Sequence, residues 1–297
     1  MVVECPLCES KTTIKRIKTK DFSFSGEFFE IHECNTCLVG FTLPELSKKE
    51  LEKYYNKEKY HSYQKDNSGF SLIYKFIQKI NSRYKLNILN RLGVKNLLDY
   101  GSGSGEFVRF CNNKGISAFG FEPINKVKSE MVYQNIKKIK DKRYDCVTLW
   151  HVLEHTKDPL SVLKFVKDVL NEGGWIIVAL PNKDSYDNIY YGKTWAGYDV
   201  PRHQYHFNPE SFKNLISSIG LKTEFTKPLF FDAFYVSVLS EKNSNNLFWF
   251  IRGLIIGLWS NIRAFFNKKH SSIIYIIKRW GLYFLYKFLA YFFLVHR

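Results

Sequence analysis

The sequence predicts an α/β fold: a mostly parallel sheet with an antiparallel last strand. Two observations support this prediction. Across residues 96–241, short apolar runs alternate with amphipathic segments, as in βαβ units. The closing apolar runs, 221–226 and 231–239, are too near each other for a helical crossover, so they should pair antiparallel. We expect a small cysteine-bearing module before this domain and hydrophobic helices after it.

The N-terminal module, residues 1–42, holds two Cys-x-x-Cys pairs among short, Phe-rich β-like runs. Each pair can place two thiolates on one tetrahedral Zn²⁺, and four thiolates leave no open position. We therefore expect a zinc ribbon with a structural metal ion, with His32 as an alternative ligand. The expected ligands are Cys5, Cys8, Cys34 and Cys37.

Residues 43–95 are predicted to form a helical lead-in or lid rich in polar and aromatic side chains. Pro44 is expected to begin one helix, and Ser47 can cap the next. Tyr74 to Leu92 carries an apolar stripe at helical spacing.

A glycine-rich loop opens the domain at 96–241. The apolar strand 96–100 contains an acid, Asp99, and is followed by Gly-Ser-Gly-Ser-Gly and a helical pattern. Glycines let the backbone turn tightly and approach a ligand closely. The next predicted strand, 117–122, ends in Glu122, which can accept hydrogen bonds from both ribose hydroxyls. Because Glu106 stands where a dinucleotide motif needs its third glycine, the loop predicts a different nucleoside-type ligand.

Further strands are expected at 134–139, 144–150 and 174–180, with a helix at 159–170. His151-Val152-Leu153-Glu154-His155 follows the strand at 144–150 and matches an inverted zinc-protease motif. That motif needs a helix interior, whereas this segment directly follows a buried strand, so we interpret the match as accidental. Cys111 and Cys146 are expected to be small core residues.

Three segments make the family resemblance specific: LWHVLEHTKDP, LNEGGWIIVALPN and DVPRHQYHF. With the glycine loop, they resemble the methyltransferase-23 group of class I S-adenosylmethionine (SAM) methyltransferases, over most of residues 1–240. The resemblance implies a Rossmann-like sheet and SAM as cofactor. It leaves the contact to the adenine amino group unassigned, because the usual acid is not evident. The implied SAM-binding residues are Asp99, Gly101, Gly103, Gly105, Glu122, Leu149, Trp150 and His151.

The segment after the strand at 174–180 is where an acceptor would approach the methyl group. A hydroxyl acceptor needs alignment and a base whose pKa is about 7. His203 and His206 are the first candidates for that base, and His151 is the next; structural packing is the alternative role. Trp195 and Tyr198 are candidates for the acceptor pocket wall, or for packing alone.

The C-terminal region, residues 242–297, is aromatic and basic. No acid follows Glu241. Basic residues interrupt every stretch long enough to span a bilayer, so we expect basic amphipathic helices that lie in a membrane interface. A helical hairpin packed on the domain and a dimer interface are the alternatives. The basic residues are Lys242, Arg252, Arg263, Lys268, Lys269, Lys278, Arg279, Lys287 and Arg297.

The function expected from these features is SAM-dependent methyl transfer to a small or lipid-linked acceptor, such as a glycolipid, a surface-polysaccharide precursor or a quinone-like ring. An rRNA or tRNA methyltransferase is an alternative, given the net charge of +16 and the zinc head. RNA would not cover the apolar tail, so nucleic acid is disfavoured. A non-catalytic membrane scaffold is a further alternative. No signal-peptide pattern opens the chain, so we expect a cytoplasmic protein, peripheral on the inner membrane face, with homo-oligomers left open.

Overall fold

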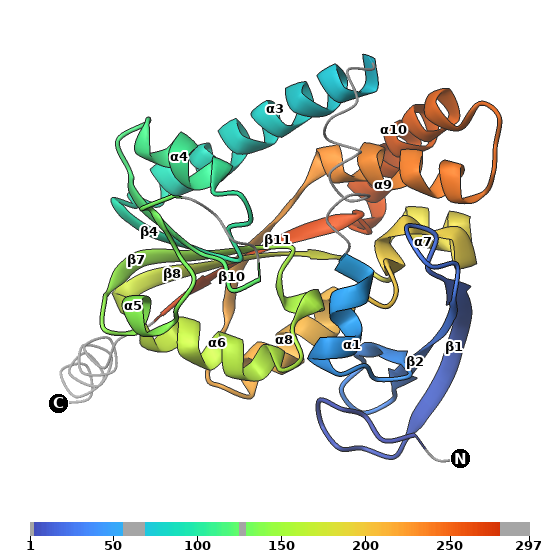
Figure 1. The fold of residues 1–297 in the computed structure, drawn as a ribbon, viewed down its shortest axis with the longest axis horizontal. Coiled ribbons are helices and arrows are strands. Elements are labelled where there is room, and N and C mark those ends of the chain that lie inside the picture. Colours follow the sequence, from blue (N-terminus) through green and yellow to red (C-terminus); the bar gives the residue numbers. More distant parts are fainter. Residues whose placement is uncertain (1–2, 56–68, 125–128, 280–297) are drawn as a thin grey trace, which may run out of the picture.

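The computed structural model describes residues 3–55, 69–124 and 129–279. Figure 1 shows a large central sheet with helices on both faces and a smaller sheet at one end, built from the N-terminal strands. The large sheet has seven strands in the order β10-β11-β8-β7-β4-β5-β6. Its strands are β4 (Asn96–Tyr100), β5 (Ser117–Phe121), β6 (Val132–Tyr133), β7 (Tyr144–Trp150), β8 (Leu170–Pro181), β10 (Thr223–Pro228) and β11 (Ser272–Lys278).

Alternation along the strands creates a core on each face of this sheet. Leu97 packs with residues of α3 and α4, whereas Leu98 packs with residues of α6 and α8. Figure 1 shows these two pairs of helices on opposite faces. The helices are α1 (Lys48–Glu52), α3 (Gly69–Arg91), α4 (Glu106–Asn112), α5 (Lys137–Lys140), α6 (Pro159–Asp168), α7 (Tyr186–Tyr191), α8 (Pro209–Ser217), α9 (Phe230–Asn243) and α10 (Trp249–Asn267).

The predicted mostly parallel sheet with an antiparallel last strand is confirmed, but a different segment forms that strand. β11 pairs antiparallel with both β8 and β10. The predicted strand at 231–239 is wrong, because this segment lies in helix α9. The buried positions of α9 recur mainly at intervals of three and four residues, which is a helical spacing: Ala233, Ser237, Val238, Ser240 and Glu241.

The C-terminal boundary predicted at residue 241 is therefore wrong. The Ile-rich segment of β11 is buried on both faces, as expected of a strand inside a sheet. α10 confirms one helix in the region 242–297, and its contacts are mostly with α9. The part of the predicted tail at 280–297 lies outside the described residues. Among the residues that the structure describes, no helix is long and apolar enough to cross a membrane.

The small sheet forms the head of the molecule, with strand order β1-β2-β3-β9. β1 (Thr13–Lys20), β2 (Phe28–Cys34) and β3 (Gly40–Leu43) come from the N-terminal module, and β9 (Tyr205–His206) comes from the segment after β8. This pairing of β9 with β3 attaches the head to the large domain.

The lead-in differs in detail from its prediction. Ser47 caps α1 through a capping box with Glu50, as expected, but no helix begins at Pro44. Residues 56–68 of the lead-in lie outside the described residues. The strand expected at 134–139 is also wrong: β6 ends at Tyr133, and 137–140 form the short helix α5.

Candidate active site

The glycine loop follows β4 and takes left-handed backbone angles. Gly101 has φ of 76°, and a Cβ there would lie 2.5 Å from a Val152 methyl carbon, so no side chain fits. Gly103 has φ of 53°, and nothing lies within 4 Å of a Cβ placed there. The loop therefore leaves open space at its tip, where a ligand can approach the backbone. Gly105 ends the loop as the N-cap residue of α4.

Glu122 is held against this loop. Its side chain is 6% exposed, and its Oε2 accepts a hydrogen bond from Gly103 N at 3.0 Å. Its Oε1 accepts another from Ile124 N, also at 3.0 Å. The two backbone amides therefore fix the orientation of the Glu122 carboxylate beside the tip of the loop.

Asp99 lies at the base of the loop. Its buried carboxyl accepts a hydrogen bond from the Thr148 hydroxyl at 2.7 Å, which joins β4 to β7. Burial raises the pKa of Asp99 to about 6. Asp99 therefore supports the strand ends beneath the loop.

The residues at the end of β7 differ in their exposure. Leu149 is fully buried in the core, so it lines no open site in this structure. Trp150 packs edge-on against Phe107, and Lys85 Nζ lies 4.3 Å from the centre of the Trp150 ring. Burial lowers the pKa of Lys85, a residue of α3 that the sequence did not single out.

His151 lies between two carboxylates. Its Nδ1 is 3.2 Å from Glu154 Oε1, and its Nε2 is 2.8 Å from Asp232 Oδ2. Burial works to lower the pKa of His151, but Asp232 and Glu154 outweigh it and raise this pKa to about 10. An imidazolium ion at neutral pH cannot accept a proton, so this geometry disfavours His151 as the base.

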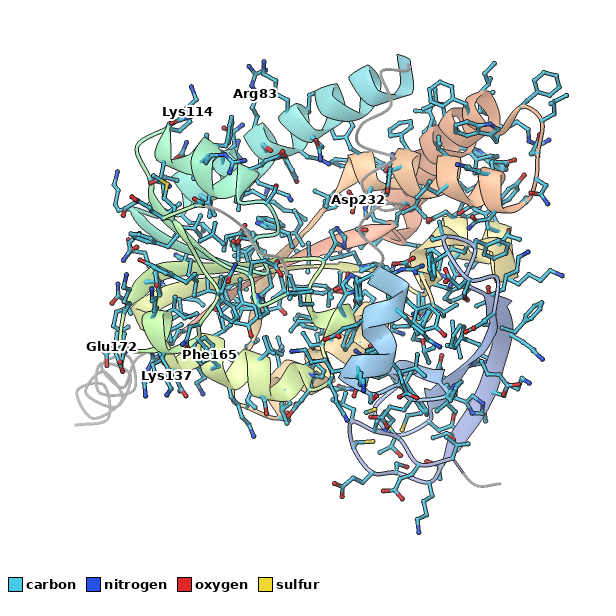
Figure 2. All side chains as sticks on the ribbon, viewed as in Figure 1. Arg83, Lys114, Lys137, Phe165, Glu172 and Asp232 are labelled. Atoms are coloured by element: carbon cyan, nitrogen blue, oxygen red, sulfur yellow. The ribbon has the colours of Figure 1, made fainter. Side chains whose placement is uncertain are left out.

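Asp232 comes from α9, and sequence reasoning missed it. Figure 2 labels its side chain at the α9 end that faces the middle of the molecule. Asp232 is the single acid within the apolar run 225–240, and that isolation is the signal that could have identified it.

A cluster of Glu154, His155 and His203, here called the histidine–glutamate cluster, lies beside His151. Their ligand atoms lie within 4.8 Å of one another, so among the described residues these three could also hold a metal ion. Burial opposes ionisation of Glu154, but His151 outweighs it and lowers the pKa of this carboxyl. Burial also lowers the pKa of His155, to about 4, so its ring is neutral.

Hydrogen bonds fix which atoms of this cluster are free. His203 Nδ1 donates to the Gly197 carbonyl at 2.9 Å, and His155 Nδ1 donates to the Arg202 carbonyl at 3.1 Å. Each ring then keeps its acceptor lone pair on Nε2. Glu154 Oε2 is buried and accepts no hydrogen bond from any described residue. His151 is the donor to Glu154 Oε1, whereas Glu154 Oε2 and the two Nε2 atoms remain as acceptors that a hydroxyl or amine proton would satisfy.

His206 is placed differently from His203. It is 4% exposed, and its Nε2 lies 2.9 Å from Thr42 Oγ1, which itself donates to the His203 carbonyl. His206 therefore donates to Thr42 and joins β9 to β3. It does not line the large cavity described next, so the geometry gives it a structural role.

A cavity of about 920 Å³ adjoins the histidine–glutamate cluster. His151, His155 and His203 line it on the side of the large sheet. Trp195 and Tyr198 form part of its wall, as the sequence suggested, and Trp195 is fixed by donating to Asp187 at 2.7 Å. Apolar side chains of α9 and α10 line the other side: Phe231, Phe234, Val236, Val238, Leu239, Phe250 and Leu254.

The head closes this cavity through its β1–β2 turn, residues 21–26. Arg202, which is 1% exposed, holds the turn by donating to Asp21 at 2.9 Å and to Asp199 at 2.6 Å. Asp21 in turn accepts hydrogen bonds from backbone amides of its own turn, among them Ser23 and Ser25. This buried ion-pair network, in which each charged group has hydrogen-bond partners, thus joins the head to the rim of the cavity.

The four predicted zinc ligands meet in the head. Cys5 Sγ is 3.7 Å from Cys37 Sγ, Cys8 Sγ is 3.5 Å from Cys34 Sγ, and all four sulfurs lie within 4.8 Å of one another. Zn–S bonds of about 2.3 Å in a tetrahedron separate sulfurs by about 3.8 Å, so the residues fit the ion. His32 is not in this group; its Nε2 faces Glu30.

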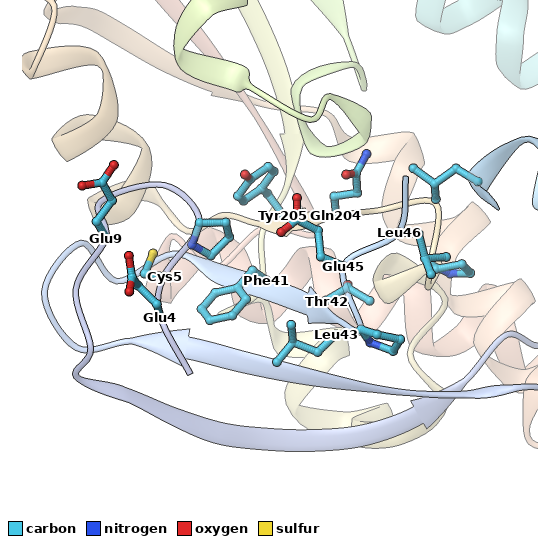
Figure 3. Close-up of a pocket in the computed structure, with 14 residues that line it drawn as sticks. Glu4, Cys5, Glu9, Phe41, Thr42, Leu43, Glu45, Leu46, Gln204 and Tyr205 are labelled. Carbon is cyan, nitrogen blue, oxygen red and sulfur yellow. The ribbon is translucent and has the colours of Figure 1, made fainter. Parts of the chain in front are cut away.

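A second, smaller cavity has a volume of about 260 Å³ and lies between the head and the segment around β9. Figure 3 shows residues that line it. Cys5, Phe41 and Leu43 line one side of it, and Gln204 and Tyr205 line another. It shares no lining residue with the large cavity. His151, His155 and His203 line the large cavity, whereas the glycine loop, Glu122 and Glu154 are not among its lining residues.

Comparisons with known proteins place this chain among methyltransferases. A family model described as a methyltransferase domain matches residues 74–224, slightly more than half of the 297-residue chain. A ubiquinone biosynthesis O-methyltransferase of Nitrosomonas europaea is 24% identical over 194 residues, which cover 58% of this chain and 81% of that protein.

Solved structures give similar matches at lower identity. A SAM-dependent methyltransferase from Archaeoglobus fulgidus matches with a TM-score of 0.44 and 20% identity, covering 68% of this chain and 94% of that one. Phosphoethanolamine N-methyltransferase 2 of Haemonchus contortus matches with a TM-score of 0.45 and 15% identity, covering 67% and 53%.

Proposed function

Because this chain belongs to the methyltransferase-domain family and is a SAM-dependent methyltransferase, we propose that it methylates a hydroxyl of a ring-bearing, largely apolar acceptor. The observation that carries this proposal is the large cavity, which joins an aromatic and aliphatic wall to a cluster of proton acceptors. The acceptor would be a small molecule or a lipid-linked one, such as a quinone-like ring.

SAM supplies the electrophilic methyl group. Glu122 would hold its ribose hydroxyls, and the open tip of the loop at Gly103 would admit the cofactor close to the backbone. Trp150 and the His151 ion pair would border its methionine end. No described residue is assigned to the adenine amino group.

His203 would accept the proton that the hydroxyl loses. Its Nδ1 is committed to the Gly197 carbonyl, so Nε2 carries the lone pair and faces the cavity cluster. The ionised Glu154 carboxylate would stabilise the imidazolium that forms, and His155 would orient the same hydroxyl. Trp195 and Tyr198 would position a ring by packing against its face.

Two facts favour a ring hydroxyl over a nucleobase. The named relative from Nitrosomonas europaea acts in ubiquinone biosynthesis as an O-methyltransferase. The cavity wall formed by α9 and α10 is mostly apolar, with Asp232, Lys242 and Asn243 as its polar members, and this composition suits an aliphatic substituent better than a ribose-phosphate chain.

We also propose that Cys5, Cys8, Cys34 and Cys37 bind one structural Zn²⁺. Backbone amides of Thr36 and Cys37 point at Cys34 Sγ, at 3.3 and 3.5 Å, as donors that stabilise a thiolate. The ion would stiffen the head, whose β1–β2 turn closes the cavity.

The test is methyl transfer from radiolabelled SAM to three probes: a prenylated catechol, the same catechol without its chain, and total ribosomal RNA. We expect transfer to the catechols, and faster transfer to the prenylated one because of the apolar wall. Labelling of RNA alone would contradict the proposal and favour the nucleic-acid alternative.

A further inference from the structure

The outer face of α10 is apolar, which is the reverse of what a water-facing helix shows. Spacings of three and four residues place Ile251, Ile255, Leu258, Ile262 and Phe265 on one face, and they are 49–75% exposed. Neighbouring large side chains extend this face: Leu247, Phe248, Trp259 and Phe266. A contiguous exposed patch of this kind marks a binding surface.

The inner face of α10 carries small residues instead. Gly253, Gly257, Ser260 and Ala264 are buried. A Cβ on Gly253 would lie 2.4 Å from the Val238 Cα, so the backbones of α9 and α10 touch. Helices that pack together in lipid show this pattern: their small residues face the neighbouring helix, and their large apolar residues face outward.

Charge at the rim of this apolar face identifies the occupant. Arg263, Lys268 and Lys269 are exposed, and among the described residues none of them forms an ion pair. The Arg263 guanidinium lies 4.7 Å from the centre of the Trp259 ring, so a cation and an aromatic ring sit together at the edge of the face. Trp and Arg at such an edge suit the headgroup level of a bilayer.

We propose that the outer face of α10, residues 247–266, docks on an anionic bilayer surface with the helix lying in the interface. A second copy of this chain fits the face less well, because a two-fold contact would bring the cations of both copies together. The same hairpin of α9 and α10 forms the apolar wall of the large cavity, so docking would bring that wall next to the lipid. The proposal does not depend on which acceptor is methylated.

The test is flotation of the full-length protein with vesicles of phosphatidylcholine alone, or with added phosphatidylglycerol. We expect flotation with the anionic vesicles, and its loss in the double variant Ile255→Glu, Phe265→Glu. Replacing Arg263, Lys268 and Lys269 by Gln should weaken partitioning about fivefold for each charge removed. The control is Phe28→Glu, a change at a residue that is 63% exposed on β2, far from α10 in sequence.

The melting temperature of each variant shows whether it folds, and exposed sites should leave it unchanged. Flotation of the double variant at the wild-type level would overturn the proposal. So would a wild-type protein that floats with neither vesicle. A dimer that dissociates in the double variant, without flotation of the wild type, would assign the face to a second copy instead.

Discussion

The two ligand clusters of this molecule differ in what surrounds them. The four cysteines lie in the head, away from the large cavity, and four thiolates complete a tetrahedral site by themselves. The histidine–glutamate cluster has only three groups, and two of them, His155 and His203, line the cavity. A closed cluster stabilises a fold, whereas an open cluster of acceptors beside a cavity can act on what enters it.

The largest effect should come from breaking the closed cluster. Cys34→Ser should abolish zinc binding and unfold the head, since structural zinc sites contribute about 10–16 kcal/mol of binding free energy to folding. Elemental analysis should give one zinc per wild-type chain and none for the variant. Glu154→Gln should leave the zinc content unchanged. A Cys5–Cys8 disulfide in metal-free wild-type protein would rule out the zinc assignment.

The open cluster is tested by His203→Ala. Loss of the base should lower turnover by about 10²–10⁴ and leave SAM affinity intact. Turnover on the catechol probe and calorimetric SAM binding are the measurements. His206→Ala is the comparison, because that residue faces Thr42 and not the cavity. If both variants turn over at the wild-type rate, the cluster does not supply the base.

Substitutions at the glycine loop should lower the affinity for SAM, which His203→Ala should leave intact. Glu122→Ala or Gly103→Leu should weaken SAM binding by about 1.5–3 kcal/mol, by removing the ribose acceptor or by filling the open tip. Zinc content should not change. Glu172→Ala is the matched control. Glu172 is an exposed acid, and Figure 2 labels it far from Asp232. Calorimetry that finds parent-like affinity for both loop variants would exclude this pocket.

The smallest effect concerns His151. Its pKa is raised from 6.5 to about 10, so its stabilising contribution is fully present below pH 6.5 and is lost as pH rises through 10. Asp232→Asn should reduce this loss, because it removes one of the two carboxylates. The measurement is the free energy of unfolding, obtained by urea denaturation at pH 6, 8 and 10 for both proteins. An identical pH dependence in wild type and variant would show that the ion pair does not form in solution.

The features that the sequence predicted correctly are local. The glycine loop with Glu122, the Ser47 cap and the two Cys-x-x-Cys turns each depend on residues close together in the chain. Their local geometry could therefore be predicted without knowing the fold.

The features that the sequence missed depend on distant contacts. Asp232 meets His151 only because α9 folds back over the end of β7, and Arg202 meets Asp21 only when the head is attached. The strand β11 was not predicted, because it lies among aromatic and basic residues that also suit a helix. Burial between two neighbouring strands made it a strand, and no pattern within 242–297 reports that burial.

The place of β11 has a consequence for synthesis of the chain. β8 emerges from the ribosome about a hundred residues before its neighbour β11, and its apolar edge has no described partner on that side until then. Among the described strands, β10 pairs only with β11, so β10 also stays unpaired until β11 has been synthesised. Because unpaired strand edges favour aggregation, a nascent chain halted between residues 245 and 270 would be a substrate for chaperones, although its glycine loop is already complete.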